Sequence, residues 1–134
     1  DIHDSRAKAE QEELTIKFKD NKAKAEQGNA KAQFNLGVSY TYGYGVSLDH
    51  RQAAKWFQKA AEQGNFNAQY NLGMMYALGQ GVIQDDVMAH MYWNVAAVSG
   101  HKGAAKNRGI IAKKMTPSQL AEAQKLAREW MRKH

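Results

Sequence analysis

The sequence contains no cysteine and no long apolar run, and both absences narrow what the chain can be. Without cysteine it forms neither a disulfide framework nor a thiolate metal site, although a reducing cytoplasm and a periplasm both suit such a chain. No stretch of about 18 uninterrupted apolar residues is present, so no segment is predicted to span a membrane. No basic-then-apolar leader is visible either.

The motifs of several enzyme classes are missing as well. The five histidines form no i, i+4 pair and no H-E-x-x-H motif, so we expect no metal ion and no cofactor. Ser5 to Lys8 and Ser99 to Lys102 match the S-x-x-K pattern of serine penicillin-recognising enzymes. We reject a β-lactamase-like function because the partner motifs S-D-N and K-T-G are absent, and we expect no catalytic residue.

An excess of positive charge is confined to the last quarter of the chain. Residues 1–29 carry six Lys/Arg and seven Asp/Glu, residues 30–100 carry four of each, and residues 101–134 carry nine and two. A basic end of this kind either keeps a terminal helix pair in solution or binds nucleic acid or another anionic surface. We favour the first interpretation, because no phosphate loop or paired aromatic platform accompanies the charge.

The most informative feature present is a repeat of 36 residues. Residues 30–65 and 66–101 share fourteen identical positions, mostly glycines, small residues and aromatics: Ala32/Ala68, Gln33/Gln69, Asn35/Asn71, Leu36/Leu72, Gly37/Gly73, Tyr40/Tyr76, Gly43/Gly79, Gly45/Gly81, Val46/Val82, Asp49/Asp85, Ala53/Ala89, Ala60/Ala96, Ala61/Ala97 and Gly64/Gly100. The pattern predicts a unit stacked on its own copy, which is typical of a binding surface rather than of a catalyst.

Each unit is predicted to contain two helices. In the first unit a helix from Ala30 to about Tyr42 ends at Gly43-Tyr44-Gly45, where glycines permit the positive φ angles of a tight reversal. Asp49 then caps a second helix over residues 50–63, and Asp85 does the same for residues 86–99. Glycine inside the first helices, at Gly37 and Gly73, costs about 1 kcal/mol, so we expect a neighbouring helix to approach closely there.

The ends of the chain continue the same register. KAEQGN at 24–29 aligns with AAEQGN at 60–65, so residues 4–27 are expected to form the second helix of a degenerate leading unit. A partial unit then begins after residue 101, and a capping box at Thr116-Pro117-Ser118-Gln119 starts a last helix over about 118–132. The predicted organisation is one repeat domain, 1–134, divided into 1–29, 30–65, 66–101 and 102–134.

These residues resemble a known family. The strings AQFNLGVSYTYGYGVSLDHRQAAKWFQKAAEQGN and AQYNLGMMYALGQGVIQDDVMAHMYWNVAAVSG are similar to Sel-one-like repeats (SLR), relatives of tetratricopeptide repeats. The resemblance covers residues 16–115, and the tail is similar to the closing segment of bacterial members, so we expect the C-terminus of the protein near His134. Asp20 in place of an aromatic and Arg108 in place of leucine suggest edge units with a partly exposed inner face.

The resemblance implies an all-α fold: a right-handed α/α superhelical solenoid of antiparallel helix pairs, closed by a C-terminal capping helix. It also implies a non-enzymatic adaptor that presents a concave groove to a protein or an extended peptide, with no small-molecule substrate. Self-association through edge helices is a further expectation. Because residue 1 is Asp rather than Met, and because small bacterial relatives are often exported, we favour the bacterial periplasm or secretion over the cytoplasm.

By the same analogy the groove is lined by first-helix positions off the buried stripe. These are Lys31, Phe34, Asn35, Val38, Tyr42, Asn67, Tyr70, Asn71, Met74, Leu78, Lys106, Asn107 and Ile110. The asparagines recur beside aromatics, and an amide can clamp a peptide backbone or bond to the adjacent repeat, so both interpretations stay open. Phe34 and Tyr70 could equally pack inside, and Met74 could belong to an adaptable apolar surface or to the core.

Overall fold

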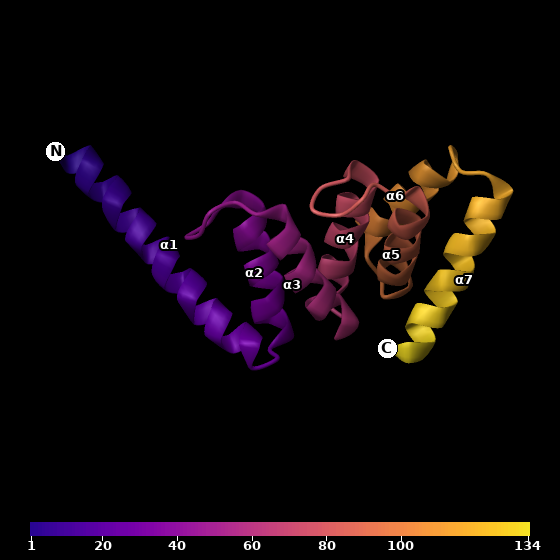
Figure 1. Ribbon diagram of the computed structural model, residues 1–134, viewed down its shortest axis with the longest axis horizontal. Helices are drawn as coiled ribbons and strands as arrows, with labels where there is room; N and C mark the ends of the chain where they lie inside the picture. The colour runs from indigo at the N-terminus through magenta and orange to yellow at the C-terminus, as the bar shows by residue number, and fades with distance from the viewer.

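The computed structural model describes residues 1–134 and is entirely helical. Its seven helices follow one another in a stack that runs from α1 at one end to α7 at the other (Figure 1). They are α1 (Ile2–Glu26), α2 (Ala30–Tyr42), α3 (His50–Glu62), α4 (Phe66–Leu78), α5 (Asp86–Val98), α6 (Lys102–Ala112) and α7 (Pro117–Lys133). None of them combines the length and the apolar character that crossing a membrane requires.

The predicted helix pairs are present. Helix α2 packs against α3 and α4 against α5, and each pair also joins its neighbours, because α3 packs on α4 and α5 on α6. The capping residues are those expected from the sequence: the Asp49 carboxylate accepts the backbone N–H groups of Arg51 and Gln52, at 3.1 and 3.2 Å. Asp85 caps α5 in the same way. The fold is therefore a solenoid of antiparallel pairs.

The glycines inside the first helices lie where an aromatic ring comes closest. A Cβ atom at Gly37 would collide with the ring of Phe57, and a Cβ at Gly73 with the ring of Trp93. Both rings are buried and come from the second helix of the same pair. The expected close approach of a neighbouring helix is thus confirmed, and its cause is a large ring on that helix.

Helix α1 supplies the second helix of the leading unit and extends beyond it. Gly45 adopts a φ of 71° and lies against the backbone of Leu14, as Gly81, with a φ of 73°, lies against His50 one repeat later. The part of α1 from Leu14 onward therefore takes the place of a second helix, whereas residues 4–13 of the predicted helix 4–27 lie before it. Residues 2–13 project from the stack and are exposed (Figure 1).

Helix α7 closes the opposite end by packing on α5. Its Ala127 is fully buried in the largest hydrophobic cluster of the core. The ring of Trp130 meets the ring of Tyr92 edge-on, with the ring centroids 6.4 Å apart. The predicted capping box at Thr116 and Gln119 is present. Helix α7 packs chiefly on α5 rather than on α6. Arg108 of α6 is half-buried and donates to Asn94 Oδ1 at 2.7 Å.

Candidate binding surface

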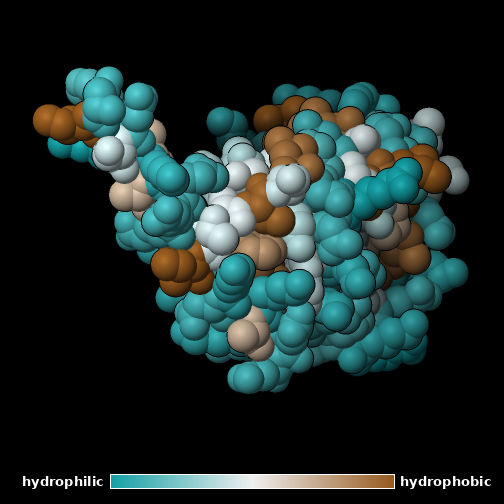
Figure 2. All heavy atoms as spheres, turned by 60° about the vertical axis from the view of Figure 1, so that its left-hand side comes forward, coloured by the Kyte–Doolittle hydropathy of each residue, from teal (hydrophilic) through white to brown (hydrophobic).

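Two pockets open between successive first helices. The α2/α4 pocket has a volume of about 440 Å³, and it is lined by Val38, Thr41, Tyr42, His50, Phe57, Tyr70, Asn71, Met74, Met75, Leu78 and Gln80. The α4/α6 pocket has a volume of about 450 Å³, and it is lined by Met74, Ala77, Leu78, Trp93, Asn107, Ile110, Ile111 and Lys114. Figure 2 shows hydrophobic patches on the body of the stack, whereas the projecting part of α1 is mostly hydrophilic.

The two pockets are copies of each other. Every residue that lines the α4/α6 pocket lies 36 positions after one that lines the α2/α4 pocket, as Trp93 follows Phe57 and Lys114 follows Leu78. Met74 and Leu78 line both pockets, so one helix, α4, forms the wall between them. The pockets are therefore a product of the repeat, and they form wherever one first helix is stacked on the next.

Each pocket has a buried aromatic ring and an exposed apolar rim. Phe57 and Trp93 are both buried, and Trp93 Nε1 donates to the backbone carbonyl of Tyr70 at 3.1 Å, which fixes the indole. At the rims Tyr42 is 63% exposed, Leu78 60% and Ile110 56%. Three large exposed side chains therefore border the two pockets.

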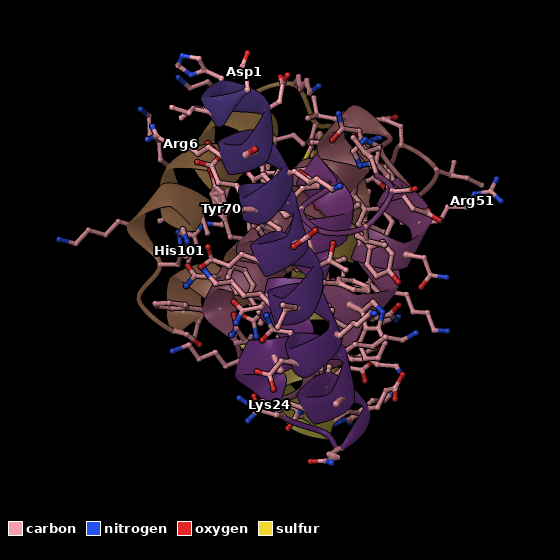
Figure 3. The ribbon with its side chains drawn as sticks, turned by 90° about the vertical axis from the view of Figure 1, so that its left-hand side faces the viewer. Asp1, Arg6, Lys24, Arg51, Tyr70 and His101 are labelled. Carbon is pink, nitrogen blue, oxygen red and sulfur yellow. The ribbon has the colours of Figure 1, made fainter.

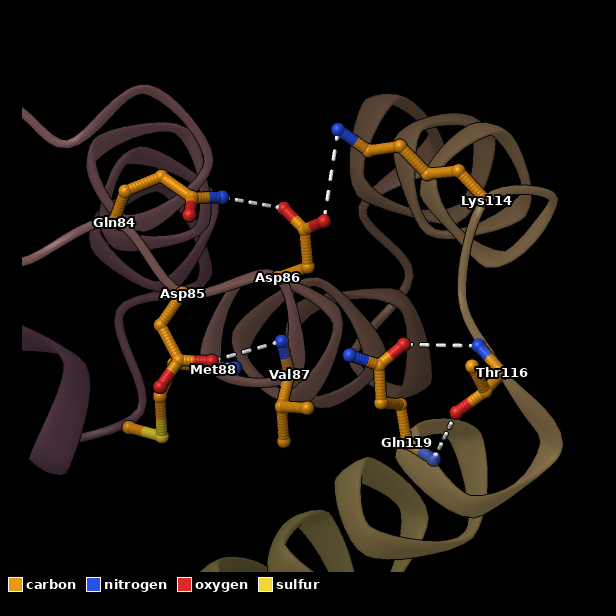
Figure 4. A network of polar contacts seen from close by, with 8 residues as sticks. All are labelled: Gln84, Asp85, Asp86, Val87, Met88, Lys114, Thr116 and Gln119. Atoms are coloured by element: carbon orange, nitrogen blue, oxygen red, sulfur yellow. Dashed lines mark hydrogen bonds and ion pairs between the residues drawn. The ribbon is translucent and has the colours of Figure 1, made fainter.

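Charge distinguishes the two copies. No Lys, Arg, Asp or Glu lines the α2/α4 pocket, whereas Lys114 stands at the edge of the α4/α6 pocket where the first copy has Leu78. Lys114 Nζ lies 3.6 Å from Asp86 Oδ2, and Asp86 also accepts a hydrogen bond from Gln84 at 2.7 Å (Figure 4). The lysine side chain is still 65% exposed, so it can reach a second anion.

The structure brings part of the predicted groove together at these pockets. Eight of the thirteen residues line one or both of them: Val38, Tyr42, Tyr70, Asn71, Met74, Leu78, Asn107 and Ile110. Lys31, Asn67 and Lys106 are exposed but line neither pocket. Phe34 packs on the ring of Phe57, with centroids 5.7 Å apart, and does not line the pocket.

The repeated asparagines do not make one uniform set of contacts. Asn35 donates to Asn21 of α1 at 3.4 Å, and Asn107 donates to the Tyr70 hydroxyl at 3.4 Å. The side chain of Asn71 makes no hydrogen bond within the chain and lines the α2/α4 pocket. Of the two interpretations, bonding to a neighbouring unit describes Asn35 and Asn107, and Asn71 is the amide left available.

Several pocket residues were not among the predicted ones. They are Thr41, His50, Phe57, Met75, Ala77, Gln80, Trp93, Ile111 and Lys114. Phe57 and Trp93 lie on second helices, whereas the predicted groove included only residues of first helices. The repeat carried a usable signal, since both copies have an aromatic residue at this position facing a glycine of the preceding helix.

His101 replaces an asparagine at the start of α6. Asn29 and Asn65 cap α2 and α4, and at the corresponding position His101 Nδ1 accepts the N–H of Ala104 at 3.0 Å. Its ring also lies 4.5 Å from that of Tyr70, and Figure 3 shows the two side chains together on one side of α1 with Arg51 on the other. This contact fixes Tyr70 at the edge of the α2/α4 pocket.

The groups with shifted pKa lie outside both pockets. Burial lowers the pKa of His90, and the nearby Arg108 lowers it further. Burial raises the pKa of Tyr92 to about 12, with smaller contributions from Tyr76 and Glu62. Burial also raises the pKa of Tyr76, and Asp85 adds to that shift. These pKa shifts are caused chiefly by burial of the three side chains in the core.

The S-x-x-K matches lie on exposed backbone away from the pockets. Ser5 and Lys8 are on the projecting part of α1, and Ser99 is the C-cap of α5. No three His, Asp or Glu side chains converge in a way that could hold a metal ion.

Comparison with protein families decides what the repeat is. The model of the Sel1 repeat matches residues 30–65 and 67–101, which together make up more than half of the chain. The chain belongs to the Sel1 repeat family. The predicted resemblance to Sel-one-like repeats is thereby confirmed, and members of this family are generally non-enzymatic scaffolds for protein interactions. No curated protein matches the chain.

Two solved structures show the same Sel1 architecture. One is a protective antigen present in uropathogenic Escherichia coli strains, with an SLR fold: it is 38% identical with a TM-score of 0.84, over 87% of this chain and 25% of that one. The other is a Sel1 repeat protein from Oxalobacter formigenes: it is 39% identical with a TM-score of 0.62, over 63% of this chain and 64% of that one. The chain thus spans a quarter of the first relative and just under two thirds of the second.

Proposed function

We propose that this chain is a non-enzymatic interaction module that holds a protein segment across the face formed by α2, α4 and α6. The observation that carries the proposal is the pair of pockets, each with a buried ring and an exposed apolar rim, repeated at the period of the Sel1 unit. Such a surface can take side chains from one partner at two places. No chemistry is needed for this role, only presentation of a fixed surface.

A protein segment suits the surface better than a small molecule does. Ligand pockets for small molecules bury most of the ligand, whereas these two hollows lie side by side along an open face and share the wall of α4. A chain that crosses α4 can fill both. Burying an apolar side chain the size of leucine in each would contribute about 1.5–3 kcal/mol apiece before the cost of ordering the segment.

Site-specific photo-crosslinking in the native host tests this proposal. A photoreactive phenylalanine derivative placed at Tyr42, Leu78 or Ile110 should cross-link to a partner protein. The same group at Lys55, Val98 or Gln124, which are exposed on α3, α5 and α7, is the matched control and should not. Each variant is first checked for the wild-type circular dichroism spectrum.

Two outcomes would contradict the proposal. Partner cross-links that form only from the control positions would place the interface on the second helices or on α7. A product that ribonuclease removes, and whose yield falls steeply with salt, would favour the nucleic-acid interpretation, because release of counterions makes such binding strongly salt-dependent. Cross-links from the three first-helix positions, insensitive to ribonuclease, support the module proposed here.

A further inference from the structure

We propose that the two pockets bind two apolar side chains three residues apart in one extended partner segment, and that Lys114 selects a carboxylate next to the side chain in the α4/α6 pocket. The inference rests on the proposed function and specifies the chemistry of the partner. Three features of the pockets carry it: their spacing, the free amide of Asn71, and the difference in charge between the copies.

The spacing follows from the shared wall. Because Met74 and Leu78 line both pockets, helix α4 lies between the pockets, and it contacts both α2 and α6. We therefore take the pockets to be about one helix spacing apart. Packed helix axes lie about 8–10 Å apart. A polyproline II segment advances about 3.1 Å per residue with three residues per turn, so residues i and i+3 point to the same side about 9 Å apart.

A flat β-strand matches the spacing less well. Its side chains alternate, so the residues that share a face are about 7 Å apart at i+2 and about 13 Å apart at i+4. The first distance is shorter than the separation of packed helices and the second is longer. A polyproline II segment that crosses α4 is therefore the conformation that puts one side chain into each pocket.

The lining suits the side chains and the backbone of such a segment. Met74, Leu78 and Ile110 are flexible apolar walls above the buried rings of Phe57 and Trp93. A polyproline II backbone has no internal hydrogen bonds, so its carbonyl and amide groups need partners where they leave water. The Asn71 side chain, which has no hydrogen bond within the chain, offers both a donor and an acceptor beside the α2/α4 pocket.

Charge distinguishes the two ends of the surface. No Lys, Arg, Asp or Glu lines the α2/α4 pocket, whereas Lys114 borders the α4/α6 pocket. Asp86 lies 3.6 Å from Lys114 and offsets part of its charge. Helix α6 itself carries Lys102, Lys106 and Arg108 and no acidic residue, so the field at this end of the surface stays positive. An acidic residue should therefore lie next to the apolar one that enters the α4/α6 pocket.

Designed peptides test the spacing directly. The probe is a fluorescein-labelled proline-rich peptide with two leucines three residues apart, followed by two glutamates. Isomers of identical composition place the leucines two or five residues apart. We expect fluorescence anisotropy to show binding of the first peptide at least about tenfold tighter than that of either isomer, because each isomer can fill only one pocket. Equal affinities, or no binding of the first peptide at millimolar concentration, would overturn the proposal.

Variants that fill one pocket give the second arm of the test. Val38→Trp should fill the α2/α4 pocket and Ile110→Trp the α4/α6 pocket, and each should remove the preference for the three-residue spacing. Ile83→Trp, on an exposed loop residue away from both pockets, is the control and should change affinity by less than about twofold. Loss of the spacing preference in the control as well would contradict the assignment.

Charge reversal tests the role of Lys114. A peptide with lysines in place of the two glutamates should bind wild type more weakly, and Lys114→Glu should reverse that order. Lys125→Glu, an equal change of charge on the exposed face of α7, should leave the order unchanged. If both reversals have the same effect, the preference comes from net charge, and the assignment to Lys114 is wrong.

The results separate this inference from the function on which it rests. If the native partner cross-links from Tyr42, Leu78 and Ile110 while the peptide isomers bind equally, the spacing rule fails and the interaction module stands. If neither Val38→Trp nor Ile110→Trp lowers the yield of that cross-link, the proposed function fails as well.

Discussion

Gly73 and Gly109 occupy the same position in successive repeats, but only Gly73 has a ring packed against it. A Cβ atom at Gly73 would overlap the indole of Trp93, whereas a Cβ at Gly109 would meet no atom within 4 Å. Gly73→Ala should therefore lower the free energy of unfolding by roughly 1–3 kcal/mol, because the buried indole must shift. Urea denaturation followed by circular dichroism measures the change.

Gly109→Ala is the matched control for that prediction. It adds the same methyl group one repeat later, on a helix where alanine is favoured over glycine by about 0.5–1 kcal/mol. We expect it to leave stability unchanged or to raise it. If both substitutions destabilise the protein equally, close packing of the ring is not the reason for glycine at this position.

His90 makes the stability of the fold depend on pH. It is 4% exposed, and burial lowers its pKa below the ordinary 6.5, with a smaller contribution from Arg108. The folded state therefore resists protonation while the unfolded chain accepts it, so stability is lost as pH falls below about 6.5. The melting temperature of wild type should fall more between pH 7.5 and pH 5 than that of His90→Leu.

An exposed histidine provides the comparison for His90. His3 lies on the projecting part of α1, so His3→Gln should keep the pH dependence of wild type. An identical fall in melting temperature in wild type and in His90→Leu would show that His90 does not contribute to acid sensitivity. The pH dependence would then arise from other titratable groups.

At the scale of elements, α7 packs on α5 and covers it. Ala127 is fully buried beside Tyr92, whereas Gln124 on the same helix is exposed. Ala127→Glu should destabilise the docked helix by roughly 2–4 kcal/mol, because it buries a carboxylate with no partner. Amide hydrogen exchange should then become faster in α7 and around Tyr92.

Gln124→Glu introduces the same carboxylate where water can solvate it. It should leave exchange in α7 and α5 as in wild type. Equal acceleration in the two variants would mean that charge, rather than burial of Ala127, detaches the helix, and the packing of α7 on α5 would have to be reconsidered.

The sequence predicted the helices well because their ends are set locally. Asp49, Asp85 and Thr116 cap helices in the structure as their side chains and spacing suggested. The position of α7 was not predictable in the same way. Its apolar face, with Leu126 and Trp130, could have covered either α5 or α6, and the chain has no earlier copy of α7 to show which.

At the scale of the whole molecule, the family resemblance placed the proposed groove on the first helices, but it did not show which of their residues line the pockets. The resemblance implied that Lys31 and Tyr42 of α2 both line the groove, yet of these two only Tyr42 lines a pocket. How far apart the first helices lie at each level depends on the size of the rings beneath them. The separation of the first helices can be judged only from the structure, which shows Phe57 facing Gly37 and Trp93 facing Gly73.

The central claim is that the face of α2, α4 and α6 holds the partner. Amide hydrogen exchange of the chain with and without its cross-linked native partner tests this most directly, because it reports every helix at once. We predict slower exchange in the C-terminal halves of α2, α4 and α6, around Tyr42, Leu78 and Ile110, with little change in α3 and α7. Protection confined to α1, α3 or α7 would contradict the account.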